Sequence, residues 1–199
     1  LDGRVDEDGV SLVFTPAGGT PLASPVDLPI SAVFAFARNG NMAARLSPSG
    51  DGFITWNAGE TPQIGVAYRS RATGAPERGR IVSTPKVAST LRGYALARSG
   101  AAAVVWVESV SDTNVQLRAI TRSAPDAPWS DPLTIRTSTS PIDAADIAID
   151  DRGNARVAWI ESARLWTSQI RATASAWEPA VSLGPASGDA QPVAQSSPN

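Results

Sequence analysis

Two acidic side chains have a spacing that could support catalysis. Glu108 and Glu161 each follow a tryptophan by two residues, in the stretches VVWVES and VAWIES. A pair of carboxylates about 5–10 Å apart performs glycoside hydrolysis, with one residue as acid and the other as base or nucleophile. Equivalent positions in neighbouring repeats are more often solvated residues at the start of a loop. We expect this structural role and assign no catalytic residue.

A second acidic cluster lies in the stretch IDDRGN, where Asp150 and Asp151 precede a glycine. Calcium requires six or more oxygen ligands, and the ligand spacing of an EF-hand loop is absent. The matching stretches SPSGDG and ARSGAA have one acidic residue between them, whereas DEDGVS has three. A turn in which Asp, Asn and Gly adopt unusual backbone angles accounts for all of these stretches. We therefore expect no bound metal and no cofactor.

Composition removes several classes of chemistry. The chain of 199 residues contains no histidine and no cysteine. Ser-His-Asp catalysis, histidine-ligated zinc, thiolate metal sites and disulfides are therefore excluded. A formal net charge of −2 argues against nucleic acid or an anionic membrane surface as a partner. No apolar run approaches the length needed to cross a bilayer, so we expect no membrane insertion.

The chain is built from internal repeats. Glycine is followed six residues later by tryptophan at Gly50–Trp56, Gly100–Trp106 and Gly153–Trp159. The N-terminal stretch VDEDGVSLVF fits the same pattern, with phenylalanine near the tryptophan position. Further along, PQIGVAYRS, VQLRAITRS and SQIRATASA superpose at a constant offset of 53 residues. A last segment repeats as PWSDPLTI and AWEPAVSL, which aligns Trp129 with Trp177.

The repeated segments predict an all-β chain. They are short, alternate between apolar and polar residues and are separated by Gly, Asn, Asp and Pro, a pattern typical of antiparallel strands. Four strands in each unit of about 40–50 residues predict a β-propeller blade, with a solenoid as the alternative. We expect a single domain over residues 1–199, with approximate repeats at 1–40, 41–90, 91–143 and 144–199.

The four four-stranded blades either close into a four-bladed ring or form part of a larger propeller. The C-terminal stretch QPVAQSSPN matches ADIAIDDRG, so the last repeat supplies a spare strand. We expect residues Pro192–Ser196 to pack in the same sheet as Val10–Phe14, which closes the ring. In an open arrangement, the exposed strand edges favour oligomers.

The stretches AIDDRGNARVAW, VQLRAITRS and PWSDPLTI resemble the blades of bacterial extracellular β-propellers, the group that contains sialidase-like and NHL-like repeats. The resemblance extends over nearly the whole chain. A sialidase Asp-box reads Ser-x-Asp-x-Gly-x-Thr-Trp, whereas SGDGFITW has Phe53 in place of the glycine of that motif. Sialidase-like chemistry would also need an arginine triad and a Tyr/Glu nucleophile pair, and the only tyrosines, Tyr68 and Tyr94, fall inside expected strands. The resemblance implies the architecture rather than the activity.

Four residues are candidates for ligand binding. Arg118 and Arg171 coincide in the repeat alignment, and a pair facing a central channel would bind carboxylates; solvent-facing strand positions are the alternative. Trp166 and Arg164 lie in the stretch SARLWTS, an expected hairpin loop with a non-repeating aromatic, and are candidates for sugar stacking or a partner contact. The recurring tryptophans are instead expected to form the core between blades.

These observations favour a non-catalytic module, secreted or on the cell surface, that binds carbohydrate or protein. We expect any signal peptide to lie outside this chain, which opens with LDGRVDEDGV. Two alternatives stay open. One is a sialidase-like glycoside hydrolase that uses Glu108 or Glu161, and the other is a structural spacer domain of a larger surface protein.

Overall fold

The computed structural model describes residues 2–6, 9–13, 26–27, 42–58, 61–73, 77 and 79–186. Within these ranges every regular element is a β-strand, and all strand pairs are antiparallel. The expectation of an all-β chain is therefore confirmed, and that of four-stranded antiparallel sheets is confirmed for three of the four described sheets, since the first has three described strands. None of the described residues belongs to a helix, so the described part of the chain holds no helix that could span a membrane.

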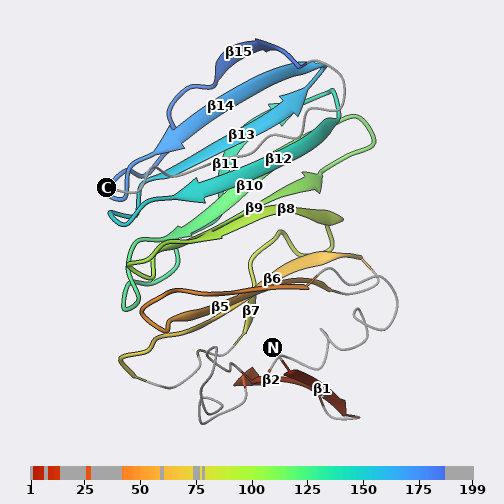
Figure 1. Cartoon of the computed structure of the whole chain (residues 1–199). Coiled ribbons are helices and arrows are strands. Elements are labelled where there is room, and N and C mark those ends of the chain that lie inside the picture. The colour runs from red at the N-terminus through yellow and green to blue at the C-terminus, as the bar shows by residue number, and fades with distance from the viewer. Residues whose placement is uncertain are drawn as a thin grey trace.

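The strands form four sheets that follow one another in chain order (Figure 1). The first sheet contains β1 (Asp2–Asp6), β2 (Gly9–Val13) and β3 (Val26–Asp27). The second contains β4 (Met42–Leu46), β5 (Gly52–Ala58), β6 (Gln63–Arg69) and β7 (Arg80–Ile81). The third contains β8 (Ser89–Leu96), β9 (Ala102–Ser109), β10 (Val115–Arg122) and β11 (Leu133–Ser138). The fourth contains β12 (Ile142–Ile149), β13 (Ala155–Glu161), β14 (Arg164–Ile170) and β15 (Val181–Pro185).

Each of the last three sheets is a meander that begins with its edge strand, β4, β8 or β12. No strand pairing among the described residues joins the sheets into a closed ring. The expected partnership of Pro192–Ser196 with Val10–Phe14 involves residues outside the described ranges. The described sheets thus give the repeating unit, and the closed ring stays a prediction.

The glycines of the repeat form the first hairpin turn of each of these sheets. Gly50, Gly100 and Gly153 have φ angles of 95°, 89° and 81°, which favour glycine because it has no Cβ. In each turn the glycine N–H donates to the carbonyl of the residue three positions earlier, at 2.9, 3.1 and 2.9 Å. The backbone requirement of this turn explains why glycine recurs there.

The core lies between neighbouring sheets. Trp56, Trp106 and Trp159 are completely buried, so the expected structural role of the recurring tryptophans is confirmed. Trp106 packs with Phe53 and Tyr68 between the second and third sheets. Trp159 belongs to a second cluster, between the third and fourth sheets. Because β9 contributes alternate residues to both clusters, burial on its two faces joins three sheets into one hydrophobic core.

In the second sheet, a glycine makes room for the buried tryptophan. Gly65 lies directly opposite Trp56 in the β5–β6 register. A Cβ atom at Gly65 would come within 2.1 Å of Cε2 of the Trp56 indole. The indole therefore occupies the space of a side chain on the neighbouring strand.

We predict that Gly65→Ala lowers the free energy of unfolding by about 2–3 kcal/mol, because the added methyl group forces the indole or β6 to move. Urea unfolding followed by tryptophan fluorescence measures this change. In a Trp56→Leu background the same glycine substitution should cost much less, since the ring it collides with is gone. An equal cost in both backgrounds would contradict this explanation.

Candidate functional site

An open cavity of about 520 Å³ lies where β4, β8 and β12 come together. Its polar lining consists of Arg45 from β4, Arg92 and Tyr94 from β8, and Asp146 from β12. Short or aliphatic residues of β8 and β12 supply the remaining wall. The site is therefore assembled from the first strand of three successive sheets.

The lining side chains are held by specific contacts. The Arg45 guanidinium lies 4.7 Å from the centre of the Tyr94 ring, a cation–π contact that links β4 to β8. Arg92 donates through Nη2 to the carbonyl of Ile142 at 3.2 Å. Asp146 accepts a hydrogen bond through Oδ1 from the N–H of Ile147 at 2.8 Å. Two cations, one carboxylate and an aromatic ring thus line one cavity.

The backbone adds further polar groups to this site. Among the described strands, β4, β8 and β12 each pair with only one other strand. Their second edges therefore leave N–H and C=O groups without a strand partner. A cavity bordered by such edges offers both donors and acceptors to a hydroxylated ligand.

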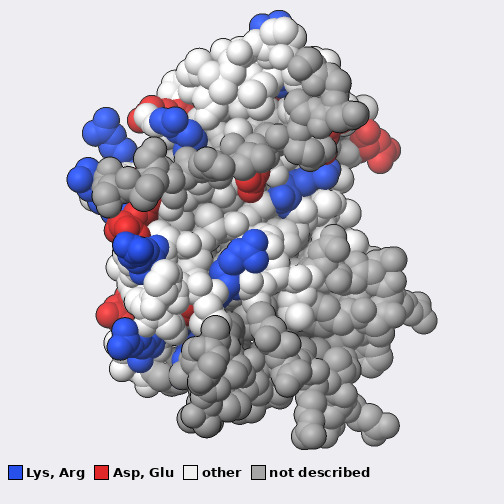
Figure 2. Space-filling view, in the orientation of Figure 1, with Lys and Arg blue, Asp and Glu red and all other residues white. Residues whose placement is uncertain are grey.

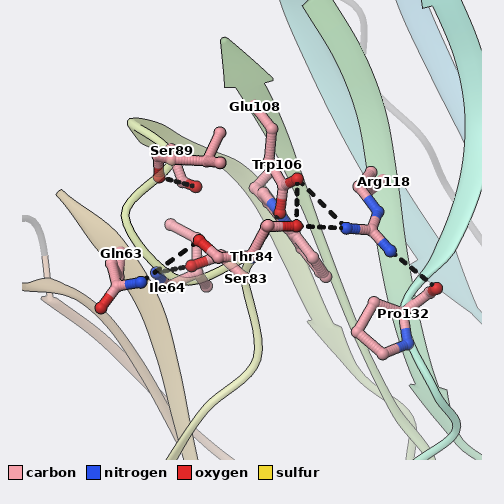
Figure 3. A network of polar contacts seen from close by, with 10 residues as sticks. Gln63, Ile64, Ser83, Thr84, Ser89, Trp106, Glu108, Arg118 and Pro132 are labelled. Atoms are coloured by element: carbon pink, nitrogen blue, oxygen red, sulfur yellow. Dashed lines mark hydrogen bonds and ion pairs between the residues drawn. The ribbon is translucent and has the colours of Figure 1, made fainter. Parts of the chain in front are cut away.

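Glu108 lies away from this cavity, completely buried between the second and third sheets. Its carboxylate accepts hydrogen bonds from Trp106 Nε1, from the N–H of Thr84 and from Thr84 Oγ1, each at 2.8 Å. Arg118 Nη1 completes the set at 3.1 Å (Figure 3). Since Thr84 belongs to the connection that leaves the second sheet, this carboxylate joins two sheets.

Glu161 repeats the arrangement one sheet later. It accepts hydrogen bonds from Trp159 Nε1 at 3.3 Å, Arg136 Nε at 3.0 Å and Ser138 Oγ at 2.5 Å. Arg136 and Ser138 belong to β11 of the third sheet, so the carboxylate again ties its own sheet to the preceding one. We call each of these arrangements a tryptophan–glutamate clamp. The expectation that both glutamates are solvated residues at the start of a loop is wrong, because each is buried and paired.

The pKa values of both clamp carboxylates reflect this environment. Burial by itself would raise the pKa of each carboxyl group. The donors from Thr84, Trp106 and Arg118 outweigh burial and hold the pKa of Glu108 below its ordinary value. Arg136, Ser138 and Trp159 do the same for the pKa of Glu161. Both groups are therefore anions that stabilise contacts between sheets, and neither lines the cavity.

Arg118 and Arg171 do not occupy equivalent positions. Arg118 lies opposite Trp106 in the β9–β10 pair, whereas the residue opposite Trp159 is Trp166. The constant offset of 53 residues therefore misaligns β14, because the β13–β14 hairpin is shorter than the β9–β10 hairpin. Arg171 follows the end of β14 and is exposed. The expected equivalence of the two arginines is wrong, and Arg118 belongs to a clamp.

Trp166 and Arg164 lie in β14 rather than in a loop. The hairpin turn is Ser162–Ala163, with φ angles of 52° and 55°, as a tight two-residue turn requires. Trp166 is half-buried and stacks on Trp159 with ring centres 6.4 Å apart. Arg164 is exposed and donates to Ser182 Oγ at 3.3 Å. The expected hairpin-loop position is wrong.

The structure thus does not gather the four expected ligand residues around the cavity. Sequence reasoning missed the residues that do line it, Arg45, Arg92, Tyr94 and Asp146. A signal for them exists in the repeats. Counted back from the turn glycines Gly50, Gly100 and Gly153, each occupies a position where the other two of these three sheets carry alanine, isoleucine, glycine or methionine. Polar residues that depart from the repeat in the first strand would have identified the site.

The Asp150–Asp151 pair organises a turn. Asp150 accepts hydrogen bonds from the N–H groups of Arg152 and Asn154 and from Asn154 Nδ2, at 2.8–2.9 Å. Slight burial opposes ionisation, but these bonds, led by those of Asn154, hold the pKa of Asp150 below its ordinary value. Asp151 accepts the N–H of Ser99 at 2.8 Å and thereby joins the turns of neighbouring sheets. No group of three or more acidic side chains suited to a metal ion occurs in the described ranges.

Comparisons with known proteins give similarity of shape at low identity. No family model and no curated protein matches the chain. The Hadza microbial sialidase Hz136 superposes with a TM-score of 0.45 and 12% identity over 68% of this chain and 36% of the sialidase. A prolyl endopeptidase superposes with a TM-score of 0.45 and 9% identity over 86% of this chain and 26% of the peptidase. The chain spans well under half the length of either protein. The fold given above is established by the strand pairings of this chain and not by these similarities.

The clamps predict a dependence of stability on pH. Because the pKa of Glu108 and that of Glu161 are lower in the folded state, both groups stabilise the fold above about pH 4.5, and this contribution is lost as the pH falls further. We expect Glu108→Gln to lower the free energy of unfolding by about 3–5 kcal/mol at pH 7 and to flatten its decrease at acidic pH. Urea unfolding between pH 3 and pH 7 measures both effects.

An exposed carboxylate provides the control for this experiment. Asp112 lies in the β9–β10 loop, and Asp112→Asn should leave stability at pH 7 unchanged within about 0.5 kcal/mol. If Glu108→Gln and the unmodified protein lose stability in parallel on acidification, the clamp explanation is contradicted.

Proposed function

We propose that the chain is a non-catalytic binding module built from the blades of a β-propeller, and that it binds carbohydrate in the cavity between β4, β8 and β12. The proposal rests on one observation: the first strands of three successive sheets converge on a cavity with polar lining. In a propeller the first strand of each blade borders the central channel. A propeller requires repeated four-stranded sheets and first strands that lie close together, and both features support the proposal.

The shape of the site favours a small hydroxylated ligand over a protein partner. A cavity of about 520 Å³ lies within the size range of small-molecule sites. A protein partner instead covers about 800 Å² of surface on each side. Arginine, aspartate and tyrosine side chains together with free strand edges match the many donors and acceptors of a sugar.

The distribution of charge supports this choice of ligand. Lys and Arg side chains are interspersed with Asp and Glu side chains over the described part of the face seen in Figure 2. Proteins that bind nucleic acid use a basic patch or stripe, and that face has none of comparable extent in its described part. We propose that the module works outside the cell, where carbohydrate ligands are available.

The lining of the cavity supports binding without catalysis. Glycoside hydrolysis uses two carboxyl groups on either side of the scissile bond. Among the described residues that line the cavity, Asp146 is the single carboxylate. Glu108 and Glu161, the alternative acidic pair, are buried in clamps between sheets. The described arrangement therefore suits recognition better than bond cleavage.

A glycan array followed by isothermal titration calorimetry tests this function. We expect binding of a mono- or oligosaccharide that Tyr94→Ala weakens at least about tenfold, because the aromatic wall and the support of Arg45 are lost. Trp166→Ala, checked for folding by circular dichroism, should bind like the unmodified protein. Loss of binding in Trp166→Ala with full binding in Tyr94→Ala would place the site at β14 and contradict the proposal.

The propeller arrangement has its own test. A closed ring of 199 residues should be a monomer with a radius of gyration of about 16 Å. X-ray scattering with in-line light scattering measures the radius and the mass together. An open arc with free sheet edges would give a larger radius or self-association, and either result would contradict a closed ring.

A further inference from the structure

One residue of the cavity is placed by an irregularity in its strand. In the β8–β9 pair, Leu91 lies opposite Trp106 and Gly93 lies opposite Val105, so Arg92 is an extra residue without a cross-strand partner. This is a β-bulge, which interrupts the alternation of side chains and re-aims the extra one. The second sheet shows no such register shift between β4 and β5. In the fourth sheet a bulge lies at a different place in the first strand, between Ile142 and Ala144, so among these three sheets only β8 has one next to the residue opposite the buried tryptophan.

The bulge directs Arg92 across to the next sheet. Its Nη2 donates to the carbonyl of Ile142 at the start of β12, and its side chain lines the cavity. The following residue, Gly93, lies so close to β12 that a Cβ atom would be 2.8 Å from Asp146 Oδ1 and 3.0 Å from Asp146 Cα. A glycine after the bulge thus lets the two strands approach, which keeps the guanidinium at the cavity wall.

The hydrogen-bonding capacity of Arg92 is only partly used. Its Nε atom is buried and has no hydrogen-bond partner among the described residues. Arg118 and Arg136, by contrast, each form an ion pair with a clamp glutamate, whereas Arg92 forms none with a described carboxylate. Of the terminal guanidinium nitrogens only Nη2 donates to a described residue, so Nη1 can donate to an acceptor in the cavity.

We infer that Arg92 anchors an anionic group, a carboxylate or a sulfate ester, on the sugar that occupies the cavity. The inference rests on the proposed function and makes it more specific. A planar guanidinium binds such oxyanions through two parallel N–H donors, which also fixes the orientation of the ligand. Arg45 adds a second positive charge to the same cavity, so the positive side chains there outnumber the carboxylate of Asp146.

Matched sugars test the inference by calorimetry. The probes are galacturonate oligomers, 6-sulfated galactose oligomers and neutral galactose oligomers of the same length. We expect at least one acidic series to bind at least about tenfold more tightly than the neutral series, with an affinity that falls as salt is added. Arg92→Gln should remove this preference and leave the weaker affinity for the neutral series.

Two further variants separate charge, geometry and folding. Arg92→Lys keeps the charge but loses the paired donors, and should retain only part of the preference for the acidic series. Arg164→Gln removes an exposed arginine of β14 that does not line the cavity, and should bind like the unmodified protein. Urea unfolding midpoints confirm that each variant is folded at the temperature of the assay.

The possible failures are distinguishable. Equal affinity for acidic and neutral sugars in the unmodified protein would overturn the role of Arg92 and leave the proposed function intact. A preference for acidic sugars that persists in folded Arg92→Gln would also overturn it. Absence of binding to every sugar on the array and in calorimetry would overturn both the inference and the proposed function.

Discussion

The architecture depends on the burial of a carboxylate between two sheets. An isolated anion in such a place would be strongly destabilising, so every buried glutamate needs several donors around it. In each clamp one donor is the indole of the same strand, and the others include a hydroxyl group from the preceding sheet or its connection, Ser138 or Thr84. The requirement for donors thus fixes the position of one sheet against the next. Apolar packing alone is less directional.

The clamps and the cavity lie in different parts of the sheets. The clamp glutamates and their tryptophans belong to β9 and β13, whereas the cavity is lined by the edge strands β4, β8 and β12. Because the second strand of each sheet carries the core, residues in the first strand are freer to depart from the repeat. Arg92 is the clearest case, since its strand accommodates an extra residue while β9 keeps its buried face.

Repeat patterns predicted the strands well and their register poorly. The stretch from 115 to 122 forms one strand as expected, and Gly50, Gly100 and Gly153 form the expected turns. The offset of 53 residues failed at β14, because hairpin loops differ in length while the alternating pattern looks alike at several offsets. That error gave Arg171 a false equivalence with Arg118. The turn Ser162–Ala163 contains no glycine, so no local signal marks where β14 begins, and Trp166 lies in that strand rather than in the expected loop.

The sequence by itself determined the all-β class, the repeating hairpins and the burial of the tryptophans, since each depends on local periodicity and turn chemistry. Tertiary structure alone decided that Glu108 and Glu161 are clamps, because in each case some of the donors lie on a neighbouring sheet or its connection, far along the chain. It also decided that Arg45, Arg92 and Asp146 share one cavity. Those residues come from three different sheets, and only the packing of the sheets brings them together.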